Sequence, residues 1–180
     1  MKIYTKTGDQ GETKLLYGDT VPKDSLAPEA YGSVDELVAS LGLIRAEEKL
    51  PIEVKETLLR IQRDLFIVGA ELATAKENRK KLKAKKTLVD NSMVEVLEKE
   101  IDFLEEKNGI PEFFVVPGEN ITSAKFEWSR VVSRRAERKC VTWQNRLEID
   151  DSKVVVYLNR LSDLLWMLAR DFEEDWTPSK

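Results

Sequence analysis

The sequence predicts an all-α fold, a five-helix bundle preceded by a glycine-rich N-terminal loop segment. Three observations predict it. Four of the eight glycines and two of the six prolines fall in the first 32 residues, which read as loop and turn with a short extended piece at Ile3-Tyr4. Farther along, apolar residues recur at steps of three and four. The 180 residues are 42% hydrophobic and 34% charged, which is typical of one globular domain.

We expect this single domain to cover 1–180, with the N-terminal segment at 1–28 and the helical bundle at 29–176. The first helix runs roughly over 29–47, with an apolar face that includes Val34, Val38 and Leu41. The second follows Pro51, because proline is favoured in the first turn of a helix, and its apolar seam extends to Leu72.

Capping residues predict the ends of the next two helices. The third starts near Asn91 or Ser92, with Glu95 as a capping-box partner for Ser92, and ends at Asn108-Gly109. The fourth begins near Asn120, a capable N-cap, and continues to about residue 146.

The fifth helix begins near Asp151-Ser152. Its first residues, Val154-Val155-Val156, are β-branched, but the leucine seam that follows favours a helix over a strand. Between the second and third helices, residues 76–86 hold seven basic residues and one acidic residue, which predicts a basic loop. This loop is either a solvated linker or a contact for phosphate or a partner.

The chain has no histidine and one cysteine, Cys140. These counts exclude Ser-His-Asp and Cys-His triads, histidine-bearing zinc or di-iron sites and an internal disulfide. Any reaction must therefore bring its own nucleophile or rely on Asp, Glu, Lys or Arg. The net charge of −4 gives no general attraction to nucleic acid, no apolar run can span a bilayer, and no apolar leader is visible, which favours the cytoplasm.

The first candidate site is the N-terminal run from Thr5 to Thr13. Its glycines allow backbone N–H groups to approach an anion, and its hydroxyls and lysines would complete a polyphosphate cradle. The run lacks the Gly-Lys-Ser/Thr of a P-loop. A plain turn-rich segment is the alternative interpretation.

The second candidate is a stripe of arginines in the fourth helix. Arg130, Arg134 and Arg138 are four residues apart, so they share one face, with Glu127 and Glu137 nearby. Arginine is a permanent forked donor suited to phosphate. The stripe is equally compatible with a solvated face of ion pairs, and an RNA-binding helix is a third interpretation.

The third candidate combines Asn159 and Asp163, one turn apart within an apolar helix, with Asp35 in the first helix. Polar residues so placed either satisfy a buried network or reach into a site. Asp35 could anchor one of the arginines.

Together these segments resemble the PduO-type ATP:cobalamin adenosyltransferases, also called corrinoid adenosyltransferases. The resemblance covers nearly the whole chain and rests on six motifs in the family's order: Tyr4-Thr5-Lys6-Thr7-Gly8-Asp9-x-Gly11, Val21-Pro22-Lys23-Asp24, Glu29-Ala30-Tyr31-Gly32-Ser33-Val34-Asp35-Glu36-Leu37, Phe114-Val115-Val116-Pro117-Gly118, Arg130-x-x-x-Arg134-Arg135-Ala136-Glu137-Arg138 and Tyr157-Leu158-Asn159-Arg160-Leu161-Ser162-Asp163.

The resemblance implies a five-helix bundle that forms a homotrimer with active sites between subunits. It implies transfer of the 5′-deoxyadenosyl group from ATP to the cobalt of cob(I)alamin, giving adenosylcobalamin and triphosphate. It further implies a cobalamin reductase and an adenosylcobalamin-dependent client enzyme as partners, and no membrane or nucleic acid.

The resemblance also assigns residues. ATP would be bound by Thr5, Lys6, Thr7, Gly8, Thr13, Lys14, Lys23, Arg134, Arg135, Glu137, Arg138 and Asn159. Magnesium would be carried mainly by the ATP phosphates, near Asn159, with no dedicated protein cage. Arg130 and Asp35 match a salt-bridged pair at the subunit interface, Asp163 matches a functional aspartate, and Phe114 matches the aromatic residue that covers the lower face of the corrinoid.

A histidine-free chain suits this reaction, because cob(I)alamin is itself a strong nucleophile and a phenyl ring at the lower face excludes ligands that would oppose cobalt reduction. Two positions depart from the family. Phe126-Glu127 replaces its Leu-His pair, and Glu119 replaces a glycine after Pro117-Gly118. The alternative function is a non-catalytic ATP- or corrinoid-binding carrier or sensor.

Overall fold

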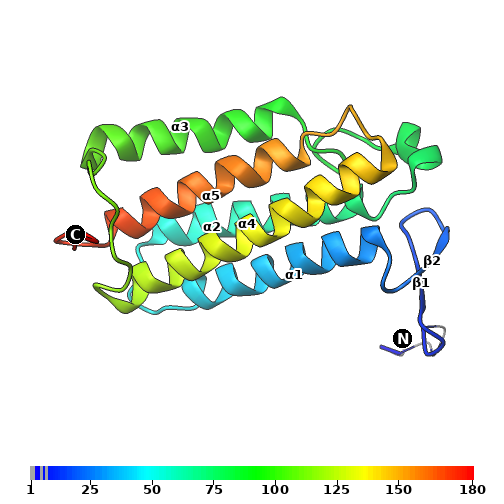
Figure 1. The fold of residues 1–180 in the computed structure, drawn as a ribbon, viewed down its shortest axis with the longest axis horizontal. Coiled ribbons are helices and arrows are strands. Elements are labelled where there is room, and N and C mark those ends of the chain that lie inside the picture. The colour runs from blue at the N-terminus through cyan, green and yellow to red at the C-terminus, as the bar shows by residue number, and fades with distance from the viewer. Residues whose placement is uncertain (1–2, 5, 7) are drawn as a thin grey trace.

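A computed structural model describes residues 3–4, 6 and 8–180. Its α-helices are α1 (Leu26–Arg45), α2 (Ile52–Leu72), α3 (Asn91–Asn108), α4 (Ile121–Leu147) and α5 (Val154–Asp171), as Figure 1 shows. A short 3₁₀ helix, η1, covers Lys76–Lys81, and strands β1 (Glu12–Lys14) and β2 (Thr20–Pro22) form an antiparallel hairpin. The prediction of a mostly helical fold is confirmed.

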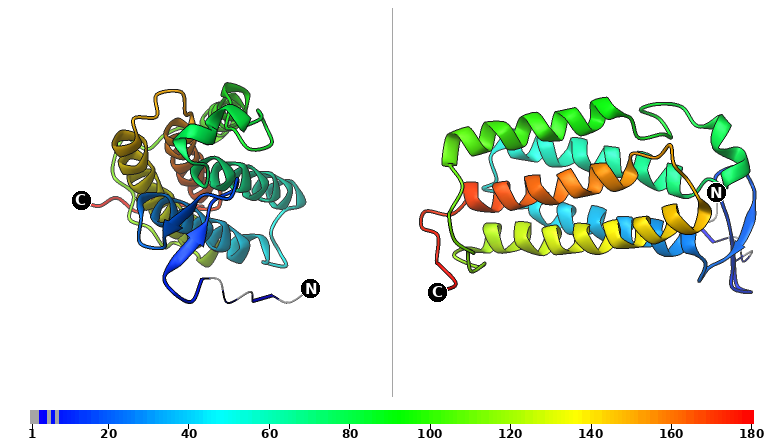
Figure 2. Two further views of the ribbon diagram at one scale, coloured as in Figure 1. Left: turned by 90° about the vertical axis from the view of Figure 1, so that its right-hand side faces the viewer. Right: turned by 45° about the horizontal axis from the view of Figure 1, so that its top comes forward.

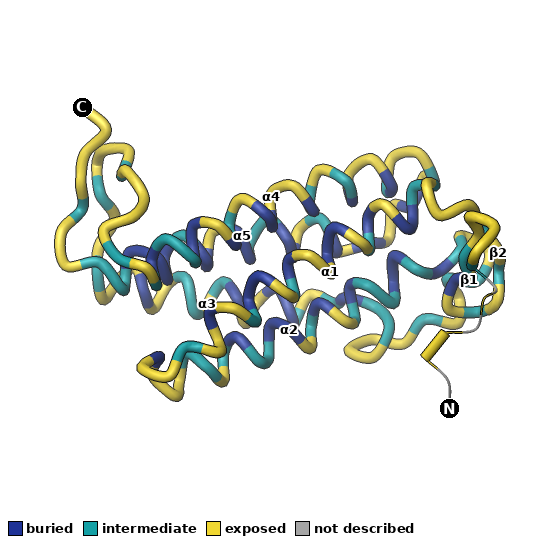
Figure 3. Tube along the Cα trace, turned by 90° about the horizontal axis from the view of Figure 1, so that it is seen from below, coloured by how far each residue is buried: buried dark blue, intermediate teal, exposed yellow. Residues whose placement is uncertain are grey.

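Helix α4 lies between α1 and α5 and packs against both, while α3 packs on α5 and α2 packs on α1. The end-on view in Figure 2 shows this arrangement. Figure 3 shows the buried residues on the helix sides that face one another. They include the fully buried Leu37, Leu65, Trp143 and Leu161. Burial of each such leucine stabilises the fold by roughly 1.5–3 kcal/mol, so packing of these seams holds the bundle together.

Two predicted helix starts are confirmed and one predicted cap is wrong. Asn120 caps α4, accepting a hydrogen bond from the Ser123 N–H at 2.9 Å within a capping box. At α3, however, the N-cap is Asp90, which accepts from the Met93 N–H at 3.1 Å and from the Ser92 hydroxyl at 2.6 Å. The predicted capping box of Ser92 and Glu95 does not form, because the carboxylate of Asp90 is the acceptor.

The N-terminal region contains more order than predicted. β1 and β2 pair with Thr13 opposite Val21, where loop alone was expected. Helix α1 begins at Leu26, three residues before the predicted start, because Pro28 is tolerated in the first helical turn, where its missing N–H would have no partner.

The predicted basic loop at 76–86 is wrong for its first part, which forms η1. Arg79 anchors this part: its Nη2 lies 3.1 Å from the fully buried Glu71 carboxylate and 2.7 Å from Asp151. A buried carboxylate needs such a partner, so Glu71 fixes the turn that follows α2.

The segments that hold candidate site residues outside the helices lie at the two ends of the bundle. The hairpin lies at one end, near the start of α1, and residues 110–120 run across the other end, near the start of α4 and the end of α5 (Figures 1 and 2). No helix in the described part of the chain is both long and apolar enough to cross a membrane.

Candidate active site

Helix α4 presents its arginines on the side that the core does not use. Val132, Ser133 and Ala136 are buried, so the helical turn places Arg134 and Arg138 at the surface. Side chains four residues apart are displaced by about 6 Å along the helix axis. The structure therefore forms the stripe that the spacing predicts.

The arginines on this helix differ in their partners. Arg135 forms an ion pair with Glu36 of α1 and so links the two helices. Arg134 and Arg138 form no ion pair with any described residue. An unpaired guanidinium keeps its forked donors available. Arg146 near the end of α4 is exposed and also forms no ion pair with a described residue, but only Arg134 and Arg138 belong to the predicted stripe, so these two are the better candidates to bind a phosphate.

Asn159 of α5 joins the arginine-bearing helix to its neighbour. Its amide nitrogen donates to the Glu137 carboxylate across the helix interface at 3.3 Å, and its amide oxygen accepts from Arg160 at 3.0 Å. Arg160 in turn donates to Glu98 of α3 at 2.8 Å. The half-buried Asn159 is thus fixed on both sides of its amide, and α3, α4 and α5 are tied together at this level.

Asp163 lies one turn farther along α5. Partial burial raises the pKa of its carboxyl, and the positive charges of Arg160 and Arg134 oppose that effect. The influence of Arg134 on Asp163 reaches from α4 to α5. The fold therefore brings Arg134, Glu137, Asn159 and Asp163 onto one face, here called the α4–α5 face.

The N-terminal segment forms a compact turn of its own. The Lys23 N–H donates to the Gly11 carbonyl at 2.8 Å, and a Cβ on Gly8 would lie 3.0 Å from Lys23 Nζ. Gly8 thus leaves room for the Lys23 ammonium. Lys6, Lys14 and Lys23 are exposed, and Thr13 lies in β1. Thr5 and Thr7 lie outside the described residues.

A cleft of about 630 Å³ lies near the other end of α4. Apolar side chains form most of its lining, with Glu112, Glu127 and Arg130 as charged members: Ile110, Pro111, Glu112, Phe113, Phe114, Val115, Pro117, Glu127, Arg130 and Trp166. Phe114 is 86% exposed, so nothing in the described chain covers its ring. We call this hollow the Phe114 cleft.

The Phe114 cleft adjoins a second hollow of about 550 Å³ between α3 and α5. This hollow is lined by Arg160 and Asp163, and it shares Ile110 and Trp166 with the Phe114 cleft. Asp163 is the one member of the α4–α5 face that lines it, so the hollow reaches from the cleft to the edge of that face.

The backbone that carries Phe114 is held by residues far away in the sequence. The Ser179 N–H donates to the Phe114 carbonyl and the Val116 N–H donates to the Thr177 carbonyl, each at 2.8 Å. Val115 and Pro178 form an antiparallel bridge between them. The exposed ring thus projects from a segment whose backbone is hydrogen-bonded.

The predicted pair of Asp35 and Arg130 is not formed within one chain. Asp35 is exposed on α1, while Arg130 Nε lies 2.7 Å from Glu127. The prediction concerned two neighbouring subunits, so it stays a prediction. Among the described residues there is no group of three or more Cys, Asp or Glu side chains arranged to hold a metal ion.

A family model described as cobalamin adenosyltransferase matches residues 3–172. The chain belongs to this family. It is 37% identical to a corrinoid adenosyltransferase of Citrobacter freundii, over 98% of this chain and 97% of that one. It is 41% identical to a corrinoid adenosyltransferase of Bacillus subtilis, over 94% and 86%. A solved variant of a PduO-type ATP:corrinoid adenosyltransferase from Lactobacillus reuteri, complexed with cobalamin and ATP, has a TM-score of 0.85 at 29% identity, covering 94% and 89%.

Membership of the cobalamin adenosyltransferase family confirms the predicted enzyme class, an ATP:corrinoid adenosyltransferase. The catalytic interpretation is supported over the carrier or sensor.

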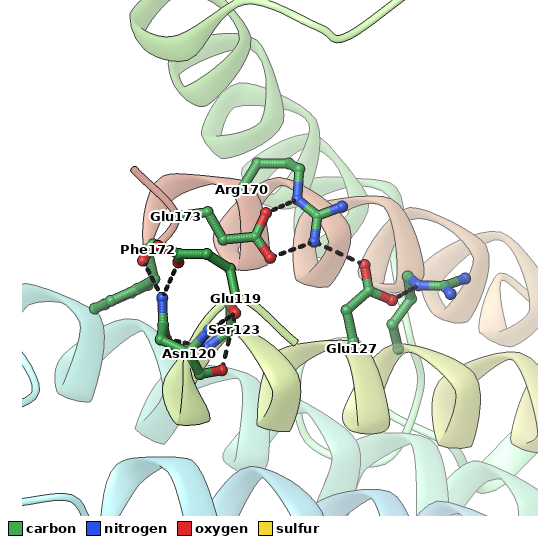
Figure 4. Close-up of polar contacts among 8 residues, drawn as sticks. Glu119, Asn120, Ser123, Glu127, Arg170, Phe172 and Glu173 are labelled. Carbon is green, nitrogen blue, oxygen red and sulfur yellow. Dashed lines mark hydrogen bonds and ion pairs between the residues drawn. The ribbon is translucent and has the colours of Figure 1, made fainter. Parts of the chain in front are cut away.

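Sequence reasoning missed two features of this site. Trp166 lies between the two hollows and lines both. Arg170, in the last turn of α5, is buried and pairs with Glu127 and Glu173 (Figure 4). The position of Arg170 directly after the buried Leu168 and Ala169 is the only local signal for its burial.

Proposed function

We propose that the chain binds ATP along the α4–α5 face and transfers its 5′-deoxyadenosyl group to the cobalt of a corrinoid seated in the Phe114 cleft. The observation that carries this proposal is that the Phe114 cleft adjoins, through Ile110 and Trp166, a hollow that is lined by Asp163 of the α4–α5 face. Cobalt and the 5′ carbon must meet, so the two binding regions must adjoin.

Arg134 and Arg138 would bind the triphosphate, because neither has an ion-pair partner in the described chain. Arg135, Glu137 and Asn159 would shape the nucleotide region through their contacts between helices. Magnesium carried by the phosphates, near Asn159, would supply further positive charge to the departing triphosphate.

Reaction requires little chemistry from side chains. The cobalt(I) electron pair forms the Co–C bond to the 5′ carbon, the C–O bond breaks, and its electron pair leaves on triphosphate. Alignment and preorganised positive charge are sufficient for such a step. Arg134 would contribute positive charge. Burial raises the pKa of Asp163, and the positive charges of Arg160 and Arg134 oppose that shift.

Phe114 would cover the lower face of the corrinoid. Its ring cannot donate an electron pair to cobalt and would exclude water, which favours a four-coordinate cob(II)alamin that is easier to reduce. The reducing electron comes from outside the protein, and we propose a cobalamin reductase as its source and an adenosylcobalamin-dependent enzyme as the client. We also propose a cytoplasmic location.

The complete site would form between subunits of a homotrimer. Within one chain, the N-terminal segment with Lys6, Gly8, Thr13, Lys14 and Lys23 lies at the opposite end of the bundle from residues 110–120 (Figure 1). A neighbouring subunit could supply the missing part, with Asp35 of one chain pairing with Arg130 of the next. Thr5 and Thr7 would belong to the same phosphate cradle.

An anaerobic assay tests the proposal. Protein, ATP, magnesium and chemically reduced cobalamin are mixed, and the light-sensitive spectrum of the cobalt–carbon product is followed. Arg134→Ala should lower kcat/KM about 100-fold, since a charged hydrogen bond contributes roughly 1.5–3 kcal/mol. Arg146→Ala, an exposed arginine on the same helix, is the matched control. Full activity of Arg134→Ala would refute its assigned role, and no product from the wild type would refute the function.

A further inference from the structure

A row of four alternating charges runs inward from the Phe114 cleft. Arg130 Nε lies 2.7 Å from one Glu127 oxygen, and the other Glu127 oxygen lies 3.1 Å from Arg170 Nη2. Arg170 Nη2 also donates to one Glu173 oxygen at 2.9 Å, and Arg170 Nε forms an ion pair with the other Glu173 oxygen at 2.7 Å. Figure 4 shows Glu127 between α4 and α5, reaching Arg170 on the far side. Each carboxylate in the row thus has a guanidinium partner.

Only the outer end of this row is accessible. The side chains of Arg170 and Glu173 are fully buried and that of Glu127 is 7% exposed, while Arg130 is 26% exposed and lines the cleft. The three buried members carry two negative charges and one positive charge. A buried carboxylate is costly unless it is paired, so the guanidinium of Arg130 is needed to neutralise the row.

We propose that Glu127 is a positioning residue for Arg130. By holding Nε, the Glu127 carboxylate fixes the plane of the guanidinium and directs its two terminal nitrogens away from the row. Arg170 and Glu173, which do not line the cleft, hold Glu127 in turn, so side chains behind the cleft help to set the orientation of Arg130. This inference rests on the function proposed above and names a residue that sets the geometry of its corrinoid side.

The same row links Arg130 to the segment that carries Phe114. Asn120, which follows that segment, donates from its amide nitrogen to the Phe172 carbonyl at 2.6 Å, in the turn that holds Glu173. The cleft wall and the charged row therefore share one support at the end of α5. Disturbing the row should affect corrinoid use and leave the nucleotide region, farther along α4, unchanged.

A double-mutant cycle tests the proposal. Glu127→Gln conserves shape and removes the charge, and it should lower kcat/KM for the corrinoid about tenfold with the KM for ATP unchanged. If Glu127 acts through Arg130, adding Glu127→Gln to Arg130→Ala should cause no further loss. The same cycle can be measured without turnover, from the affinity of each variant for cob(II)alamin with ATP present, determined by titration.

Glu71→Gln is the matched control. Glu71 is another fully buried glutamate that pairs with an arginine, Arg79, but it lies at the opposite end of the bundle and lines neither hollow. Glu71→Gln should lower the thermal stability about as much as Glu127→Gln does, but it should leave corrinoid kinetics unchanged. If Glu127→Gln does not fold, Glu173→Gln replaces it in the cycle with the same expected result.

Two results would overturn the proposal. One is a loss in Glu127→Gln that multiplies with that of Arg130→Ala, which indicates independent effects. The other is an equal fall of corrinoid kinetics and ATP use in Glu127→Gln and Glu71→Gln, which indicates a general structural role. A wild-type protein that binds corrinoid but forms no product would instead refute the proposed reaction, and the binding cycle would still decide the role of Glu127.

Discussion

Replacement of Phe114 by alanine should affect turnover that starts from cob(II)alamin more than turnover that starts from cob(I)alamin. The ring is 86% exposed in the chain, so its removal should change the free energy of unfolding by less than about 0.5 kcal/mol. Against a bound corrinoid the same ring becomes buried, and full burial of a phenylalanine side chain is worth roughly 1.5–3 kcal/mol. At about 1.4 kcal/mol per factor of ten, Phe114→Ala should slow turnover that starts from cob(II)alamin by roughly 10- to 150-fold.

The assay compares two starting substrates under the same anaerobic conditions. With pre-reduced cob(I)alamin, the reduction step is bypassed, so Phe114→Ala should lose much less activity, and the KM for ATP should not change. Phe113→Ala is the matched control, because Phe113 is adjacent, lines the same cleft and is 42% exposed. Equal losses from both cobalamin states, or the larger selective loss in Phe113→Ala, would refute the lower-face role of Phe114.

Three further predictions concern the bundle itself. Leu161→Ala, at a fully buried position in α5, should lower the free energy of unfolding by about 2–5 kcal/mol in urea denaturation. Cys140 should resist a thiol reagent at pH 8 until the protein is denatured, because burial, with Glu137 and Glu71 nearby, raises the pKa of its thiol to about 12. Asp90→Ala should cost about 1 kcal/mol at pH 7. Hydrogen bonds from Ser92 and the Met93 N–H hold the pKa of Asp90 below its unfolded value of 3.8, so this stabilisation is present above that pH and is lost as the pH falls through the folded-state pKa; denaturation curves that keep a constant gap down to pH 2 would contradict it.

Apolar periodicity and local capping residues in the sequence predict most of the fold. The seams of α2 and α5 can be read directly from the spacing of leucines and isoleucines, and Asn120 can be predicted as a cap because asparagine is favoured at the N-cap position. The valines at the start of α5 were assigned to a helix correctly, because the seam that follows outweighs the β preference of three residues.

Features that depend on distant partners could not be read in this way. Strands β1 and β2 are three residues each, too short for an alternating pattern to be visible. Arg79 looked like part of a solvated basic run, because its partner Glu71 lies on the preceding helix and is recognisable as buried only in three dimensions.

In the candidate site, too, local contacts are predictable from the sequence and contacts with distant partners are not. The spacing of Arg130 and Glu127 indicates a contact along one helix, and the structure has it. The second contact of Glu127, with Arg170, crosses between α4 and α5 over more than forty residues and leaves no local pattern. Sequence reasoning therefore predicts that these charges share one stripe of the helix, and it misses the buried Arg170 and Glu173 that support them.

The backbone pairing of Phe114 with the stretch 177–179 has a consequence for substrate preference. Two segments far apart in the sequence share the aromatic wall of the cleft, and the second is the C-terminal stretch that follows α5. We expect a change in this stretch to alter how the wall is presented to a corrinoid while ATP recognition stays the same. Exchanging this stretch between homologues and ranking their corrinoid substrates would measure that change; identical rankings would show that the stretch has no effect.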